Sequence, residues 1–258
     1  ALPTPIPPRP FERGVGGRPT LVQNVESLAH AALLARTPRS AGALSVLLTV
    51  SGHGGPPTVV ELAQGTPLGA AVHAAGGDVT RHAALLLGGY FGSWVDAREA
   101  ASLPLDAAAL RLGNRALGAG VIALLQPQEC GLGAAAQVAR HLASESAQQC
   151  GPCVFGLRSI ADVLTRVAAC DAEPHELTRL RTWAREVRGR GACRHPDGAA
   201  AMVLSALDLF EAEAVSHAYQ RICSFGAVPA APSMWSTSGP VPLPPPVALP
   251  GAAGAPSW

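Results

Sequence analysis

Lysine is absent from this chain of 258 residues, so all 19 of its Lys-or-Arg positions are arginine. The 18 acidic residues nearly balance them and leave a formal net charge of +1. A chain with so little net charge lacks the long-range field that draws a protein to nucleic acid or to an anionic membrane. We therefore expect no nucleic-acid partner.

Long apolar runs are missing too. No stretch approaches the ~20 consecutive apolar residues of a membrane-spanning helix, so we expect no transmembrane segment. The N-terminus does not combine a basic segment with an apolar one, as a secretory signal does. Six cysteines are too few for a disulfide scaffold in a chain of this length, which favours a reducing compartment. These features predict a soluble, cytoplasmic protein.

Glycine and proline, at 28 and 24 residues, are abundant and gather at the ends and at a few junctions. The apolar, periodic segments between these junctions predict separate compact units. Residues 1–42 combine a Pro-rich lead with one amphipathic helix over residues 21–35. Residues 223–258 contain too few large apolar side chains to fold, and we expect a disordered tail there.

Residues 43–125 show the two-residue apolar period of strands. The pattern predicts two short strands of a hairpin, then a helix, then two further strands on either side of a glycine-rich loop at 88–94. The predicted elements are strands at 45–51, 58–62, 84–87 and 121–125 and a helix at 68–75. We therefore predict a small sheet domain here.

Residues 126–222 return to the 3.6-residue period of helices. Four apolar stripes lie within residues 132–143, 154–167, 177–187 and 202–214. Because the connections are short, neighbouring helices should run antiparallel as a four-helix bundle. The predicted fold class is therefore α+β, with the sheet domain followed by the bundle.

Three cysteines are placed where they can meet. Cys150 and Cys153 lie between the first and second predicted helices of the bundle, and Cys193 lies between the third and fourth. In an up-down bundle both connections fall at the same end. Cys153 also begins a helix, where free N–H groups and the positive end of the dipole favour a thiolate. This spacing is typical of a metal centre.

Other interpretations of these thiols are open at this stage. The sequence Cys150-Gly151-Pro152-Cys153 is also the dithiol of thioredoxin-like thiol-disulfide oxidoreductases, although no strand precedes it here. His195 would complete a tetrahedral zinc site, unless it only begins the turn in which Asp197 caps the fourth helix. A structural or interaction module with unligated thiols is a further alternative. The remaining cysteines match no motif and are expected to be buried thiols: Cys130, Cys170 and Cys223.

Four segments, in this order, resemble one family of redox proteins: GRPTLVQNVESL at 17–28, GGYFG at 88–92, LGAGVI at 117–122, and Glu145-Ser146 followed by Cys150, Cys153 and Cys193. The family is the NADH-oxidising flavoprotein subunit of respiratory NADH:quinone oxidoreductase (complex I) and its relatives in NAD-linked hydrogenases and formate dehydrogenases. The resemblance covers about residues 14–217 and concerns only the C-terminal part of that subunit.

The resemblance implies a function. It makes residues 1–42 a remnant of the flavin domain, residues 43–125 a soluble-ligand-binding-type (SLBB) β-grasp domain, and residues 126–222 an iron-sulfur-binding helical domain. Cys150, Cys153 and Cys193 would ligate a 4Fe-4S cluster that passes electrons from reduced flavin to a ferredoxin-like acceptor. Other oxidoreductase subunits would be the partners.

The sequence departs from the family at two places. Ala147 stands where the family has the first cluster cysteine, which predicts a 4Fe-4S cluster with a labile iron or a 3Fe-4S cluster. The N-terminal flavin and NADH domain has no counterpart, so FMN and NAD are expected only if a partner supplies that domain. The family has two adjacent asparagines on the flavin side at positions 23 and 24. Only Asn24 matches them, because Gln23 stands at the other position.

Overall fold

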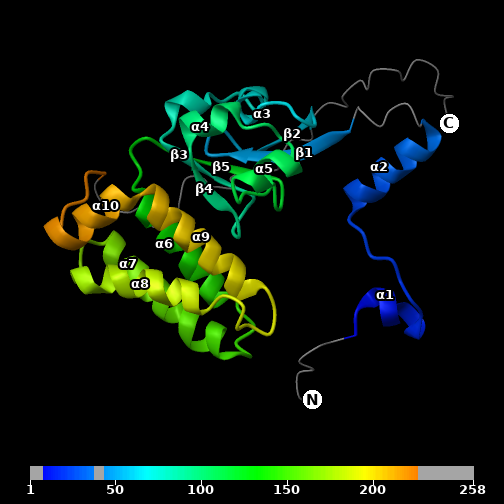
Figure 1. Cartoon of the computed structure of the whole chain (residues 1–258). Helices are drawn as coiled ribbons and strands as arrows, with labels where there is room; N and C mark the ends of the chain where they lie inside the picture. The colour runs from blue at the N-terminus through cyan, green and yellow to red at the C-terminus, as the bar shows by residue number, and fades with distance from the viewer. Residues whose placement is uncertain (1–7, 38–43, 226–258) are drawn as a thin grey trace. The chain divides into compact units, whose positions relative to one another are not determined.

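The computed structural model describes residues 8–37 and 44–225, which fall into two units (Figure 1). The first holds α1 (Pro10–Arg13), a 3-10 turn η1 (Val15–Gly17) and α2 (Val25–Arg36). Asn24 caps α2, because its side chain accepts a hydrogen bond of 2.7 Å from the backbone N–H of Ser27. This cap starts the helix four residues later than the apolar pattern predicts. None of the side chains of α2 is buried within this unit.

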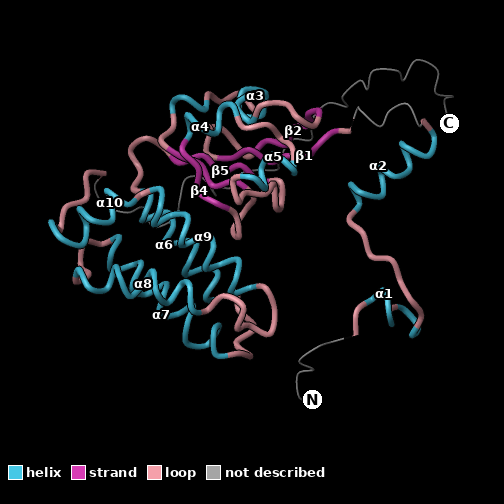
Figure 2. The backbone as a smooth tube through the Cα atoms, in the orientation of Figure 1, coloured by secondary structure: helices cyan, strands magenta, loops and turns pink. Residues whose placement is uncertain are grey.

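The second unit contains one five-stranded sheet in the order β2-β1-β5-β3-β4 (Figure 2). The adjacent strands β1 and β5 are parallel, while β3 is antiparallel to both β5 and β4. The strands are β1 (Ser45–Ser51), β2 (Thr58–Ala63), β3 (Ala84–Leu87), β4 (Ser93–Asp96) and β5 (Val121–Leu125). The helices beside them are α3 (Leu68–Ala74), η3 (Val79–Arg81), α4 (Ala97–Ser102) and α5 (Ala107–Leu112).

Both faces of the central strands are covered. Leu86 and Ala123 belong to a core shared with the helices that follow, whereas Leu85 and Leu124 belong to a core under α3, α4 and α5. Successive side chains of a strand point to opposite faces, so a strand buried on both sides must be apolar throughout. The continuous apolar runs of β3 and β5 follow from this position in the sheet.

Beyond the sheet the described chain is helical, and its class is α+β, as predicted. Pro152 starts a π-helix, η4 (Pro152–Leu157), that continues directly into α7 (Arg158–Ala168). The other elements are α6 (Gly131–Ser144), α8 (Pro174–Glu186), α9 (His195–Leu209), α10 (Glu211–Val215) and a second π-helix, η5 (Ser216–Gln220). α6 packs against α7 and α9, and α8 packs against the same two helices. No helix in the described ranges combines the length and apolarity needed to cross a membrane.

Trp94 of β4 joins the sheet to these helices. Its backbone N–H donates a hydrogen bond of 3.1 Å to Ser205 Oγ on α9, and its ring meets the edge of Phe210 at 5.4 Å. The sequence pattern predicts a loop at Trp94, whereas this residue lies in β4. The strand has only four residues, too few to display an alternating pattern, and Asp96 at once caps α4. The sheet and the helices therefore share one core through this short strand.

Substitution of Gly92 by alanine should destabilise the fold by about 3 kcal/mol, near the upper end for a single substitution. A Cβ at this position would overlap the carbonyl oxygen of Leu87, which the β3–β4 connection cannot move away. Chemical denaturation measures the effect. Gly151→Ala is the matched control, because no atom lies within 4 Å of its added Cβ. Equal stability of the two variants would contradict the steric argument.

Candidate metal centre

Cys150 and Cys193 come from different connections that meet at one end of the helices. Cys150 precedes η4, and Cys193 lies in the loop between α8 and α9. The backbone N–H of Ala192, in the Cys193 loop, donates to the Cys150 sulfur and is the main cause of the lowered pKa of this thiol. The backbone N–H of Cys153 adds to the effect. Oriented N–H groups thus stabilise a thiolate at Cys150.

Cys153 lies inside the same group of thiols. Its side chain is buried, and burial is the main reason why its pKa rises to about 11. A hydrogen bond to Cys150 and the negative charges of Cys150 and Cys193 raise it further. The structure therefore brings together the three thiols that the sequence analysis selected, with Cys193 exposed and Cys153 buried.

Two of the residues just before Cys150 form hydrogen bonds with nearby residues of the chain. Ser146 is buried, and its hydroxyl donates a hydrogen bond of 3.0 Å to the carbonyl of Ala143. Gln148 adopts φ 52° and accepts a hydrogen bond of 2.7 Å from Arg158. Ala147, between them, is exposed and carries no donor atom. This segment supplies no sulfur at the position where a fourth thiol is expected.

His195 is engaged by a neighbouring helix. Its Nε2 lies 2.8 Å from the carbonyl oxygen of Leu142 on α6, and its ring packs at 5.3 Å against the edge of Phe91. A tetrahedral zinc site that includes His195 would therefore have to use Nδ1, while Nε2 keeps its hydrogen bond to Leu142.

The turn between β3 and β4 reaches this end of the helices. Tyr90 stacks on His141 of α6 at 4.6 Å, and Phe91 contacts His195 at the start of α9. A side chain at Gly198 would overlap the Phe91 ring, so glycine is needed for this close approach. The sequence analysis singled out the GGYFG turn only as a family motif. Its two adjacent aromatic residues, in a chain with 4% aromatics, were the available signal.

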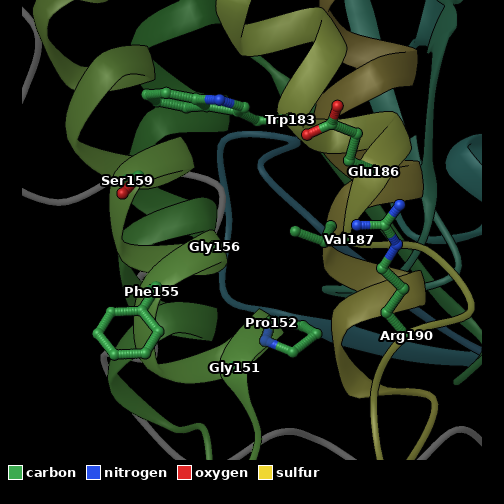
Figure 3. Close-up of a pocket in the computed structure, with 9 residues that line it drawn as sticks. All are labelled: Gly151, Pro152, Phe155, Gly156, Ser159, Trp183, Glu186, Val187 and Arg190. Carbon is green, nitrogen blue, oxygen red and sulfur yellow. The ribbon is translucent and has the colours of Figure 1, made fainter.

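A cavity of about 380 Å³ opens beside the Cys150–Cys153 turn (Figure 3). Trp183, half-buried and packed against the helical core, forms one side of it. The Arg179 guanidinium lies over the Trp183 ring, 4.5 Å from its centroid. The lining residues are Gly151, Pro152, Phe155, Gly156, Ser159, Trp183, Glu186, Val187 and Arg190. Access to the turn from this side is therefore largely apolar.

Asp197 closes the loop that carries Cys193. One carboxylate oxygen accepts a hydrogen bond of 2.6 Å from the backbone N–H of Gly189, and the other pairs with Arg194 at 2.8 Å. The prediction that Asp197 caps the helix was wrong, because α9 already begins at His195. The carboxylate lies within the first turn and binds the loop instead. Sequence reasoning did not identify this anchor.

Replacement of Asp197 by alanine should loosen this loop and destabilise the chain by roughly 1–2 kcal/mol, since a charge-assisted hydrogen bond to Gly189 is lost. The hydrogen bond from Arg194 is the main cause of the lowered pKa of Asp197. A carboxyl group whose pKa is lowered on folding stabilises the fold at pH values above its ordinary pKa of about 3.9. That contribution is lost as the pH falls through the folded-state pKa.

Denaturation curves between neutral and acid pH test this linkage. The control is Asp208→Ala, because Asp208 forms an exposed surface pair with Arg181, and such pairs contribute about 0–1 kcal/mol. A variant at Asp197 that loses no more stability than the variant at Asp208 would contradict the anchoring role.

Comparison with known proteins identifies this region. Residues 133–217 match a family model described as the NADH-ubiquinone oxidoreductase-F iron-sulfur binding region. The NADH-quinone oxidoreductase F 2 subunit of Rhizobium meliloti (strain 1021) is 29% identical over 237 residues, covering 87% of this chain and 56% of that protein. The corresponding F subunit of Streptomyces coelicolor is 28% identical over 239 residues, covering 89% and 53%. The chain thus spans about half the length of these curated relatives.

A solved structure agrees with the sequence matches. The air-oxidized NAD+-reducing NiFe hydrogenase superposes with a TM-score of 0.70 at 25% identity, over 90% of this chain and 40% of that one. The matched region includes Cys150, Cys153 and Cys193. The family comparison does not favour the thioredoxin-like or cluster-free alternatives. The chain is therefore similar to the C-terminal part of the NADH-quinone oxidoreductase F subunit, and its residues 133–217 match that family's iron-sulfur binding region.

Proposed function

We propose that Cys150, Cys153 and Cys193 hold an iron-sulfur cluster and that this chain transfers electrons. The observation that carries the proposal is the meeting of thiols from two separate connections inside a region of the iron-sulfur family. A bound cluster would supply reversible one-electron transfer, with a potential set by burial and by hydrogen bonds to its sulfurs.

The residues present fit such a group at three positions. The N–H groups of Ala192 and Cys153 already point at the Cys150 sulfur, as donors to a thiolate ligand do. Cys153, at the start of a long helical segment, is buried and therefore shielded from water. The fourth position is unmatched, because Ala147 has no donor atom. We therefore assign either a 4Fe-4S cluster with one labile iron or a 3Fe-4S cluster.

The same proposal extends to the architecture. The order β2-β1-β5-β3-β4, with parallel β1 and β5 and a helix after β2, supports a β-grasp domain of the SLBB type over residues 43–125. The mutual packing of α6, α7, α8 and α9 supports a four-helix iron-sulfur domain over residues 126–222. Residues 1–42 would be the part that belongs with a flavin domain. The disordered tail predicted for 223–258 lies, after residue 225, outside the described residues.

Electrons would come from reduced flavin and leave to a ferredoxin-like acceptor in another oxidoreductase subunit. The relatives are named as subunits of NADH-quinone oxidoreductases, which supports partners of this kind. FMN and NAD would require a domain that lies outside these 258 residues. Asn24 remains our candidate for a flavin contact. This contact would use the side-chain nitrogen Nδ2, since Oδ1 caps α2.

Iron and acid-labile sulfide analysis after anaerobic reconstitution tests the proposal. We expect about three to four irons per chain, with matching sulfide and visible charge-transfer absorption. The chain alone should bind no stoichiometric FMN. Tightly bound zinc at these thiols without visible absorption would contradict the cluster assignment. Reversible formation of a Cys150–Cys153 disulfide in metal-free protein that takes up no iron would favour a dithiol function instead.

A further inference from the structure

A second group of potential metal ligands lies away from the first. Cys130, His217 and Cys223 place one donor atom each within 4.8 Å of one another. Cys130 is the N-cap of α6, whose 14 residues extend ~21 Å toward the Cys150 segment. Figure 1 shows α10, which leads to His217, at the opposite end of the helices from the α8–α9 loop. The two groups are therefore separate sites.

His217 is oriented as a metal-bound histidine would be. Its side chain is fully buried, and Nδ1 lies 3.0 Å from the carbonyl oxygen of Val167. Nδ1 must carry the proton to donate to this carbonyl, so Nε2 presents a lone pair. Within the described residues Nε2 has no hydrogen-bond partner. A buried unpaired nitrogen is costly, and a backbone acceptor on the other ring nitrogen is the usual support of a histidine ligand.

Cys130 and Glu213 face each other in the same region. The Cys130 thiol donates a hydrogen bond of 2.8 Å to Glu213 Oε1 and accepts one of 3.2 Å from the backbone N–H of Gly133. The thiol is almost completely buried. Burial and the adjacent Glu213 carboxylate raise the pKa of Cys130, so this thiol keeps its proton until a cation takes the proton's place. A capping thiol alone would not explain why His217 and Cys223 converge on it.

The chain is folded back to bring Cys223 to this group. Glu213 and His217 are four residues apart in the continuous helix of α10 and η5, which puts both on one face. Arg221 then adopts a left-handed conformation with φ 57° and ends the helix. The Arg221 guanidinium pairs with Glu173 at 2.7 Å, which fixes this reversal against the start of α8. Cys223 follows two residues later.

We propose that Cys130, His217, Cys223 and Glu213 form a closed zinc site. Two thiolates and an imidazole bind zinc in preference to calcium or magnesium, and the Glu213 carboxylate would complete the tetrahedron. Each thiol loses its proton to solvent as its zinc–sulfur bond forms. The donor atoms of Cys130, His217 and Cys223 already lie within 4.8 Å of one another. A small movement would therefore bring each of them to about 2.0–2.3 Å from a zinc ion placed between them. The ion would fasten the end of the helical region to α6 and α7.

The test uses the full chain with Cys150, Cys153 and Cys193 all replaced by serine, so that the result does not depend on the proposed cluster. Zinc is added anaerobically, the protein is dialysed, and bound metal is measured. We expect a single zinc ion per chain and a rise in the unfolding temperature that a chelator reverses. Cobalt in place of zinc should give thiolate-to-metal charge-transfer bands of a tetrahedral site.

Further substitutions in this background identify the ligands. Cys223→Ser and His217→Gln should each weaken zinc affinity by at least about tenfold, since even loss of a supporting group costs that much. The control is Cys170→Ser: burial and the charges of Cys223 and Glu213 raise the pKa of Cys170, so this thiol lies near the site without belonging to the proposed ligand set. Helical circular dichroism establishes that each variant is folded.

Two results would overturn the proposal. One is a folded parent that retains no zinc, or that forms a Cys130–Cys223 disulfide under anaerobic purification. The other is undiminished zinc affinity when Cys223→Ser and His217→Gln are combined. Cluster assembly at Cys150 is measured separately in the native sequence, so failure of one site is distinguishable from failure of the other.

Discussion

Serine at Cys150, Cys153 or Cys193 is expected to abolish the iron-sulfur cluster completely. A cubane normally takes four protein thiolates, and this site offers three, because Ala147 stands at the remaining position. A site that is already one ligand short has no ligand to spare. Iron, acid-labile sulfide and visible absorption after anaerobic reconstitution measure the loss, which should be equally complete for all three variants.

The matched control is Cys170→Ser. Cys170 is also a free cysteine, but it follows α7 at the end of the helices remote from Cys150. Its replacement should leave iron content and absorption unchanged. Full cluster assembly in Cys193→Ser would show that the α8–α9 loop supplies no ligand. Partial loss in the Cys170 variant would show that the effect of serine is on folding and not on ligation.

The contrast between β3 and β4 shows which strands a sequence can predict. Leu85 and Leu86 point to opposite faces of the sheet and both are buried, so β3 appears as an uninterrupted apolar run. β4 has four residues, begins at Ser93 and ends at the cap Asp96, and its position is set by pairing with β3 and by contact with α9. A contact with a helix as distant in the chain as α9 leaves no local pattern, and four residues are too few to show the alternation of a strand.

The helices that carry the thiols were easier to predict. Their apolar stripes are long: α6 begins and ends within one residue of the predicted limits, and the second stripe, predicted over 154–167, spans η4 and α7. The fourth stripe, predicted over 202–214, belongs to α9 and α10, which separate at Phe210, where the backbone leaves helical geometry at ψ 32°. Helical periodicity continues across such a break, so the sequence alone gives one helix.

The two groups of cysteines differ in how far the sequence reveals them. Cys150 and Cys153 form a motif within one turn, and Cys193 lies in a connection whose end of the bundle follows from helix order. Cys130, His217 and Cys223 belong to no motif, and the sequence analysis expected Cys130 and Cys223 to be ordinary buried thiols. They converge only because Arg221 reverses the chain and Val167 orients the histidine.

Replacing Ala147 by cysteine should convert the proposed labile cluster into a stable 4Fe-4S cluster. Ala147 is exposed and lies between Ser146 and Gln148, so a larger side chain meets no core residue. The new thiol would stand three residues before Cys150, at the position where the resemblance expects the fourth ligand. We expect iron loss on mild oxidation to slow by at least about tenfold, since a full ligand should contribute no less than a supporting group.

Ala147→Ser is the appropriate control, because serine has nearly the same size as cysteine but is a poor ligand for a cluster. The rate at which a chelator captures iron, and the paramagnetic signal of a 3Fe-4S product after oxidation, measure the effect. The Ala147→Cys variant should show slow capture and no such signal, while Ala147→Ser should behave like the native chain. Equal rates in the native chain and both variants would mean that another residue already binds the fourth iron, because an added thiol would then have no vacant ligand position to fill.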